Sequence, residues 1–232
     1  KHESRFAFSK NQINDLTTYA IVGLIIGARL GYVLFYNFSY YLRHPLEIFL
    51  PFSFSNGFAF TGISGMSYHG GLIGAVLAGG WYVRKSGLKI WDATDLFFSA
   101  VPLGYTFGRL GNFMNGELYG RVTTAPIGMV FPQAPDAALR HPSQLYEAFF
   151  EGVFLFVILW RLRKMTNSRG AMLAFYVIGY GTVRFFIEFF RQPDAHIGFI
   201  FLSFSMGQIL CALMIAGGIG LYLYLRQTQE RV

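Results

Sequence analysis

Six long apolar segments constrain the fold of this chain more than any other feature of its sequence. A helix needs about 20 apolar residues to cross a bilayer, and six stretches reach or approach that length. They are residues 17–37, 67–83, 92–113, 144–160, 171–190 and 199–225. Because hydrocarbon offers no hydrogen-bond partner to the backbone, such segments are expected to be helical. We therefore predict an all-α polytopic membrane protein in which residues 1–232 form a single membrane domain.

The composition agrees with a membrane protein and argues against other classes. Only 13% of the residues are charged, whereas soluble domains carry roughly 25%. The net charge of +7 does not indicate nucleic-acid binding, because the basic residues are spread over separate loops. Cys211 is the only cysteine and lies inside an apolar segment. We therefore expect no intramolecular disulfide and no nucleophilic role for this thiol.

Lysines and arginines concentrate in alternate connections, which predicts the orientation. The basic side holds Lys1, Arg5, Lys10, Arg84, Lys85, Lys89, Arg161, Arg163, Lys164, Arg169, Arg226 and Arg231. This side should face the cytoplasm. The longer connections then lie outside, where we expect an amphipathic arm over residues 38–66 and a small, partly β-structured head over the proline-containing residues 114–143. The chain begins at Lys1 without an initiator methionine, so we expect that an N-terminal part precedes it.

Three arginines, Arg29, Arg109 and Arg184, lie inside the apolar segments. A charged residue in a membrane span is costly and by default marks a functional site. At about 1.5 Å per residue from the cytoplasmic ends, all three should reach the outer half of the bilayer. A guanidinium matches a phosphate bidentately, so we predict a site for the phosphate of an outer-leaflet lipid. The alternatives are structural ion pairs, above all for Arg29, and for Arg109 a side chain that extends to the interface.

Two helical stripes surround this predicted site. In the third segment, Arg109, Asn112 and Asn115 recur at i, i+3 and i+6, and Glu117 follows at the rim. Gly104 and Gly108 in the same segment have the spacing of closely packed helices.

The second stripe lies on the fifth segment. Tyr180, Arg184, Glu188 and Arg191 recur at i, i+4, i+8 and i+11 and therefore share one face. Glu188 has the spacing needed to orient Arg184 or Arg191. Further carboxylates that could pair with the arginines are those of the fourth segment, Glu147 and Glu151.

His69 begins the second segment at its predicted outer end, followed by Gly70 and Gly71. These glycines would leave room for another group to approach, so His69 is a candidate base; the alternative is a hydrogen-bonded structural histidine. Nearby, residues 62–65 match the G-x-S-G of rhomboid intramembrane proteases. That reading is disfavoured, because the last three segments contain no histidine to complete a catalytic pair. We expect no metal site, since no two histidines or carboxylates have ligand spacing on one helix.

Five motifs in the same order along most of the chain resemble the prolipoprotein diacylglyceryl transferase family. They are A-R-L-G-Y-V-L-F-Y at 28–36, H-G-G-L-I-G at 69–74, G-R-L-G-N-F-M-N-G-E-L-Y-G at 108–120, H-P-S-Q-L-Y-E-A at 141–148 and Y-G-T-V-R-F-F-I-E-F-F-R at 180–191. The motif at 108–120 is long and specific. The family has seven spans, and its first span is absent from this sequence.

The resemblance implies a reaction in the bacterial inner membrane, with the active site toward the outer leaflet. The diacylglyceryl group of phosphatidylglycerol would move to the lipobox cysteine of a prolipoprotein signal peptide, without metal or cofactor. Phosphatidylglycerol, the signal peptide and membrane lipids would be the partners. The implied catalytic residues are His69, Arg109 and Arg184. The implied substrate-binding residues are Arg29, Arg109, Asn112, Glu117, Gly120, Tyr180, Glu188 and Arg191.

A lipid or anion transporter is the competing function, because three arginines at one depth would serve it equally well. A transporter needs polar groups along a path to the cytoplasmic side. That half of the predicted spans is almost purely apolar, which favours the enzyme.

Overall fold

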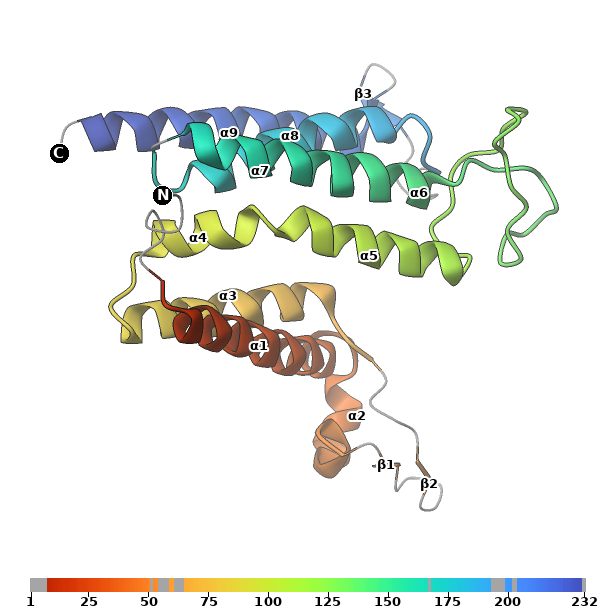
Figure 1. Cartoon of the computed structure of the whole chain (residues 1–232). Helices are drawn as coiled ribbons and strands as arrows, with labels where there is room; N and C mark the ends of the chain where they lie inside the picture. The colour runs from red at the N-terminus through yellow and green to blue at the C-terminus, as the bar shows by residue number, and fades with distance from the viewer. Residues whose placement is uncertain are drawn as a thin grey trace. The chain divides into compact units, whose positions relative to one another are not determined.

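The computed structural model describes residues 8–50, 52–53, 59–60, 65–166, 168–192, 199–201 and 204–230. The chain divides into two compact units, residues 1–90 and 91–232, each of which is described by itself (Figure 1). Helices dominate both units, and within the described residues four strands of two or three residues accompany them. The predicted α-helical class is therefore confirmed in its coarse form.

The first unit is built on two antiparallel helices with a short side arm. Its elements are α1 (Lys10–Tyr36), α2 (Phe38–Arg43), the 3-10 turn η2 (Pro45–Ile48), β1 (Phe52–Ser53), β2 (Ala59–Phe60) and α3 (Tyr68–Lys85). A reciprocal cap between Ser9 and Gln12 fixes the start of α1. The arm predicted over residues 38–66 thus contains short helices and a two-stranded hairpin. Its position outside the membrane stays a prediction.

Glycines let α1 and α3 approach at backbone distance. An added Cβ on Gly27 would lie 2.8 Å from the Cα of Gly74, and one on Gly31 would lie 2.7 Å from the Cα of Gly70. These neighbours are backbone atoms, which cannot move aside without separating the helices. Small residues are the usual means of such close packing in membranes, where the hydrophobic effect does not drive helices together. The close contact of this unit therefore depends on glycine.

The second unit contains the remaining elements. They are α4 (Ile90–Phe98), α5 (Val101–Met114), α6 (Ser143–Glu147), the π-helical turn η3 (Ala148–Phe154), α7 (Leu155–Met165), α8 (Ala171–Ile187), β3 (Phe199–Phe201), β4 (Phe204–Ser205) and α9 (Met206–Glu230). α8 packs along α9, and α5 packs on η3. Figure 1 shows α6, η3 and α7 as one continuous rod. Buried Leu155, Leu159, Met172 and Ala174 form part of the core between these helices.

The predicted segments overlap the helices, but the third and the last segments are not single helices. The third segment was expected to run unbroken over 92–113, whereas α4 ends at Phe98 and α5 begins at Val101. Pro102 occupies the first turn of α5 and lacks the N–H that a continuous helix would need. The last segment was expected to begin at residue 199, but residues 199–201 form a strand and α9 begins only at Met206.

Length and composition alone mark two described helices as able to cross a membrane, Lys10–Tyr36 and Met206–Thr228, and Ala171–Ile187 is a shorter apolar helix. On α1 the large side chains of Ile21, Val22 and Leu24 are about half exposed. An exposed apolar surface of this kind suits contact with lipid. The full set of six spans remains a prediction.

At one end of the second unit, α4 caps α8. Both carboxylate oxygens of Asp95 accept backbone N–H bonds, from Gly170 at 2.9 Å and from Met172 at 2.8 Å. The Asp95 side chain is almost fully buried. A carboxylate at a helix start satisfies unpaired N–H groups and interacts favourably with the helix dipole. The broken third segment is thereby fixed to the fifth.

We expect Gly27→Ala to destabilise the first unit, because the added Cβ meets the backbone of Gly74. Overpacking of this kind typically costs about 1–3 kcal/mol. Thermal unfolding in detergent should show a lowered midpoint. Gly80→Ala on α3 is the control, since an added Cβ there meets nothing within 4 Å; equal midpoints for the two variants would contradict the proposed role of this contact.

Candidate active site

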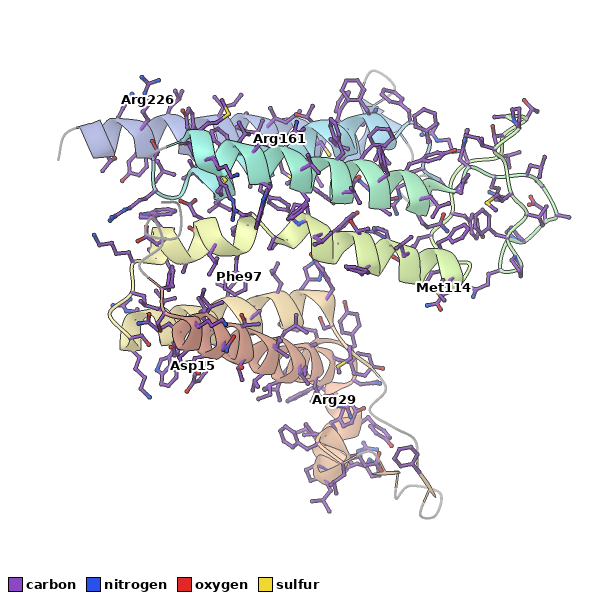
Figure 2. The ribbon with its side chains drawn as sticks, in the orientation of Figure 1. Asp15, Arg29, Phe97, Met114, Arg161 and Arg226 are labelled. Atoms are coloured by element: carbon purple, nitrogen blue, oxygen red, sulfur yellow. The ribbon has the colours of Figure 1, made fainter. Side chains whose placement is uncertain are left out.

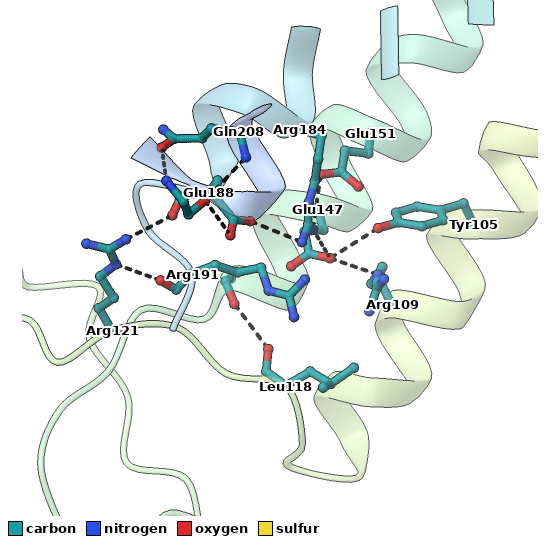
Figure 3. Close-up of polar contacts among 12 residues, drawn as sticks. Tyr105, Arg109, Leu118, Arg121, Glu147, Glu151, Arg184, Glu188, Arg191 and Gln208 are labelled. Carbon is teal, nitrogen blue, oxygen red and sulfur yellow. Dashed lines mark hydrogen bonds and ion pairs between the residues drawn. The ribbon is translucent and has the colours of Figure 1, made fainter. Parts of the chain in front are cut away.

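A buried carboxylate, that of Glu147, joins Arg109 and Arg184. Its Oε2 atom lies 2.9 Å from Nε of Arg109 and 3.2 Å from Nη1 of Arg184. The hydroxyl of Tyr105 donates to the same oxygen at 3.1 Å (Figure 3). The sequence predicted that Arg109 and Arg184 would converge, and the structure brings them together. They meet at the carboxylate of Glu147, which the sequence offered as a possible ion-pair partner.

Arg184 is surrounded by acidic side chains. Besides Glu147, its guanidinium contacts Oε1 of Glu151 at 3.6 Å and Oε2 of Glu188 at 3.2 Å. The Glu188 contact is the predicted i,i+4 pair within the fifth segment. Charges this deeply buried require partners, because desolvation otherwise outweighs their attraction. The ion pairs therefore hold the Arg184 side chain in one place.

Arg109 retains capacity for a further acceptor. Its Nε is used by Glu147 and its Nη1 donates to Oδ1 of Asn112 at 3.0 Å. A guanidinium has five N–H donors on three nitrogens, and in the part of the chain that the structure describes these contacts engage two of them. The side chain is 19% exposed, so the guanidinium is partly accessible. Pairing with Glu147 and binding of an anion are therefore compatible.

The polar stripe of the third segment continues to the rim as a hydrogen-bonded chain. Asn112 donates to Oε1 of Glu117 at 2.8 Å, and Asn115 donates to the same oxygen at 3.3 Å. The amides of Asn112 and Asn115 hold the pKa of Glu117 below its usual range, because they stabilise the ionised carboxylate. Arg109, Asn112, Asn115 and Glu117 thus act as one connected set, as their spacing predicted.

The turn after α5 is held from the start of the fourth segment. Gln144 donates to the carbonyl of Glu117 at 2.6 Å, and Ser143 donates to that of Leu118 at 3.2 Å. Both side chains are fully buried. Leu118 has a φ of 58°, a left-handed conformation that is unusual for a residue with a Cβ and persists only where its surroundings enforce it. Ser143 and Gln144 supply that enforcement.

Gly120 and Arg191 lie at the junction of the predicted head with α8. They form an isolated antiparallel bridge, and the Gly120 N–H donates to the His141 carbonyl at 2.8 Å. An added Cβ on Gly120 would lie 2.8 Å from that carbonyl oxygen. Nε of Arg121 donates to the Arg191 carbonyl at 2.6 Å. Gly120 is therefore required by close packing, and the backbone of Arg191 anchors the head.

Comparison with known proteins identifies the family. A family model described as prolipoprotein diacylglyceryl transferase matches residues 1–224. The chain belongs to the prolipoprotein diacylglyceryl transferase family. Among curated relatives named phosphatidylglycerol–prolipoprotein diacylglyceryl transferase, that of Chlorobaculum tepidum is 57% identical over 97% of this chain and 78% of its own length. That of Treponema denticola is 45% identical over 96% of this chain and 80% of its own, and that of Helicobacter pylori is 42% identical over 100% and 83%.

Arg29 belongs to the first unit, and its contacts favour the structural alternative. Its Nε donates to the carbonyl of Ile48 at 2.7 Å, and its Nη2 donates to that of Glu47 at 2.6 Å. The guanidinium also stacks over the ring of Tyr41, with Cζ 5.0 Å from the ring centre. Figure 2 labels Arg29 in the part of α1 that leads into α2. Arg29 therefore fixes the arm to α1.

His69 lies in the first turn of α3 with an exposed side chain, 5.7 Å from the ring of Tyr68 between ring centres. The prediction that Gly70 and Gly71 leave room for another group beside His69 is wrong. Gly70 packs on α1, and Gly71 would place a Cβ 3.3 Å from that of Ala28. They serve the contact between two helices, and the exposure of His69 at the helix start makes it accessible instead. Residues 62–64 of the G-x-S-G match lie outside the described residues.

Five residues of this cluster and the adjoining turn were not predicted to have a site role. Glu147 and Glu151 were named only as possible partners, and Tyr105, Ser143 and Gln144 were not singled out. A signal for Tyr105 was present, because it precedes Arg109 by four residues and so shares its helix face. Its ring lies under the Arg109 guanidinium, 4.8 Å from Cζ, and edge-on to Tyr180 at 5.8 Å. Tyr180 thus contributes to the wall of the site.

We expect Arg109→Lys to lose most activity although its charge is kept. Lysine cannot hold Glu147 and Asn112 while presenting another donor, because its ammonium is a point charge without the guanidinium fork. The loss of a charge-assisted hydrogen bond should remove about 1.5–3 kcal/mol or more, roughly a tenfold to hundredfold fall in kcat/KM. Initial rates of lipid transfer would measure this. Arg84→Lys at the end of α3 is the control, and full activity in Arg109→Lys would reduce Arg109 to a generic cation.

Proposed function

We propose that this chain transfers the sn-1,2-diacylglyceryl group of phosphatidylglycerol to the lipobox cysteine of prolipoproteins. The glyceryl carbon–oxygen bond breaks, a carbon–sulfur thioether forms, the thiol loses its proton and glycerol-1-phosphate leaves. Family membership over residues 1–224 supports the reaction. The single structural observation that carries it is the convergence of Arg109 and Arg184, from two different helices, on one point at Glu147.

In this proposal the two guanidiniums bind the lipid phosphate. Negative charge grows on the leaving phosphate oxygen as the carbon–oxygen bond breaks, and fixed cations stabilise it without reorganisation. Asn112 and Glu188 hold Arg109 and Arg184 in place. The nucleophile belongs to the substrate, in keeping with Cys211, which is buried within α9. The outer rim around the lipid headgroup is formed by Glu117, Gly120 and Arg191.

We further propose that six helices of this chain cross the bacterial inner membrane. The basic connections would face the cytoplasm, and the arm and the head of residues 114–143 would face outward. α5 ends at Met114, next to the head, so Arg109 would lie near the outer leaflet. Membrane lipids and the signal peptide are the partners that this placement allows, and nucleic acid is not among them.

The decisive test is a transfer assay with purified protein. The protein would be placed in phosphatidylglycerol vesicles with a lipobox peptide, and mass spectrometry would follow the peptide. A mass gain equal to one diacylglyceryl group is expected, with release of glycerol-1-phosphate. A peptide in which the cysteine is replaced by serine should remain unmodified. Movement of phosphatidylglycerol between leaflets without peptide modification would instead favour a transporter.

The role of His69 is tested by its pH dependence. If His69 removes the thiol proton, His69→Gln should be nearly inactive at pH 7 and regain activity as the pH approaches ~8.5, where a free thiol ionises by itself. Rates measured between pH 6 and 9 would show a steeper rise for the variant than for the wild type. An unchanged profile with a weaker apparent lipid affinity would make His69 a binding residue.

A further inference from the structure

The carboxylate of Glu188 is held at the beginning of α9. Its Oε1 accepts a hydrogen bond from the Ser205 hydroxyl at 3.2 Å, while its Oε2 contacts Arg184 at 3.2 Å. The two oxygens thus connect α8 to α9 on one side and to the active-site arginine on the other. Glu188 and Ser205 are both buried, so solvent does not compete for these contacts.

Ser205 is itself fixed by a reciprocal cap of α9. Its backbone N–H donates to Oε1 of Gln208 at 3.0 Å, and the Gln208 N–H donates to the Ser205 hydroxyl oxygen at 3.2 Å. This is the arrangement of a capping box, which satisfies two unpaired N–H groups at a helix start. The hydroxyl of Ser205 therefore accepts from α9 and donates to Glu188 at once. A carboxylate near a helix N-terminus also gains from the helix dipole.

Gly207, the second residue of α9, makes the approach of Glu188 possible. An added Cβ at this position would lie 2.9 Å from Oε1 of Glu188 and 3.0 Å from its carboxyl carbon. The side chain of Glu188 would have to move to accept it. Because its other oxygen contacts Arg184, that movement would release the guanidinium from one of its ion pairs.

We propose that Ser205, Gly207 and Gln208 are positioning residues for the transfer reaction. The start of α9 sets the place of the Glu188 carboxylate, and Glu188 sets the place of the Arg184 guanidinium. None of the three needs to touch lipid or peptide. The proposal rests on the proposed function, because it assumes that Arg184 stabilises the leaving phosphate.

Gly207→Ala is the sharpest test, because it displaces the Glu188 carboxylate without removing any polar group from the start of α9. Displacing a buried, paired carboxylate should lower the thermal midpoint, so rates are compared at a temperature well below the midpoint of the variant. The kcat should fall tenfold or more, and the KM for the peptide should stay within about twofold, because displacement of Glu188 acts on the charged transition state and leaves peptide binding intact. Gly217→Ala and Gly220→Ala on the same helix, where an added Cβ meets nothing within 4 Å, should keep wild-type kcat.

Two further variants separate positioning from a general packing defect. Ser205→Ala should lose activity, and Ser205→Thr, which keeps the hydroxyl, should restore most of it. In a Glu188→Ala background, Gly207→Ala should cause no additional loss, since no carboxylate remains to be displaced. An equal loss of activity in both backgrounds would overturn the proposal that Gly207 acts through Glu188.

The outcomes distinguish this inference from the proposed function. Wild-type protein that forms no lipidated peptide would refute the proposed function. Wild-type protein that is active alongside an equally active Gly207→Ala variant would refute the positioning role and leave the function standing.

Discussion

The second unit depends on one buried carboxylate between two cations. Glu147 is 1% exposed and accepts contacts from Arg109, Arg184 and Tyr105 on a single oxygen. In an apolar surrounding no member of this set can lose its partners without leaving a costly uncompensated charge. The helices that carry them, α5, α6 and α8, are therefore fixed relative to each other by electrostatics as well as by packing. The guanidiniums of Arg109 and Arg184 are thereby oriented in advance, which would reduce the reorganisation needed to bind an anion.

The two units solve the problem of packing apolar helices in different ways. α1 and α3 come together through glycines, at distances that only a missing side chain allows. α5 and η3 meet through a polar contact as well, because the Thr106 hydroxyl donates to the Ala148 carbonyl at 3.2 Å. Here too a glycine is needed, since a Cβ on Gly152 would lie 3.0 Å from that of Thr106. The unit that carries the charged cluster is thus joined by directional bonds.

Much of this arrangement could be predicted from the sequence, and the failures have physical reasons. Apolar length found the helices, and helical spacing found the stripe of Arg109 and Asn112, because both depend on local pattern. The partners of Arg29 could not be found, since they are backbone carbonyls that every residue possesses. The left-handed Leu118 was hidden for a similar reason: its conformation is imposed by Ser143 and Gln144 from a distant part of the chain. Pro102 indicated a helix break, but the apolar residues on both sides of it favoured one unbroken span.

The π-helical turn η3 changes which side chains of this segment share a face. Its seven residues wind with i→i+5 bonds between α6 and α7. A wheel drawn at 100° per residue loses its phase across such a turn. Side chains that share one face in such a drawing are rotated apart in space, so core residues such as Leu159 give no guide to the direction of Glu147. Residue numbering is therefore a poor measure of angle around this rod: Glu147 before the turn and Glu151 within it both reach Arg184.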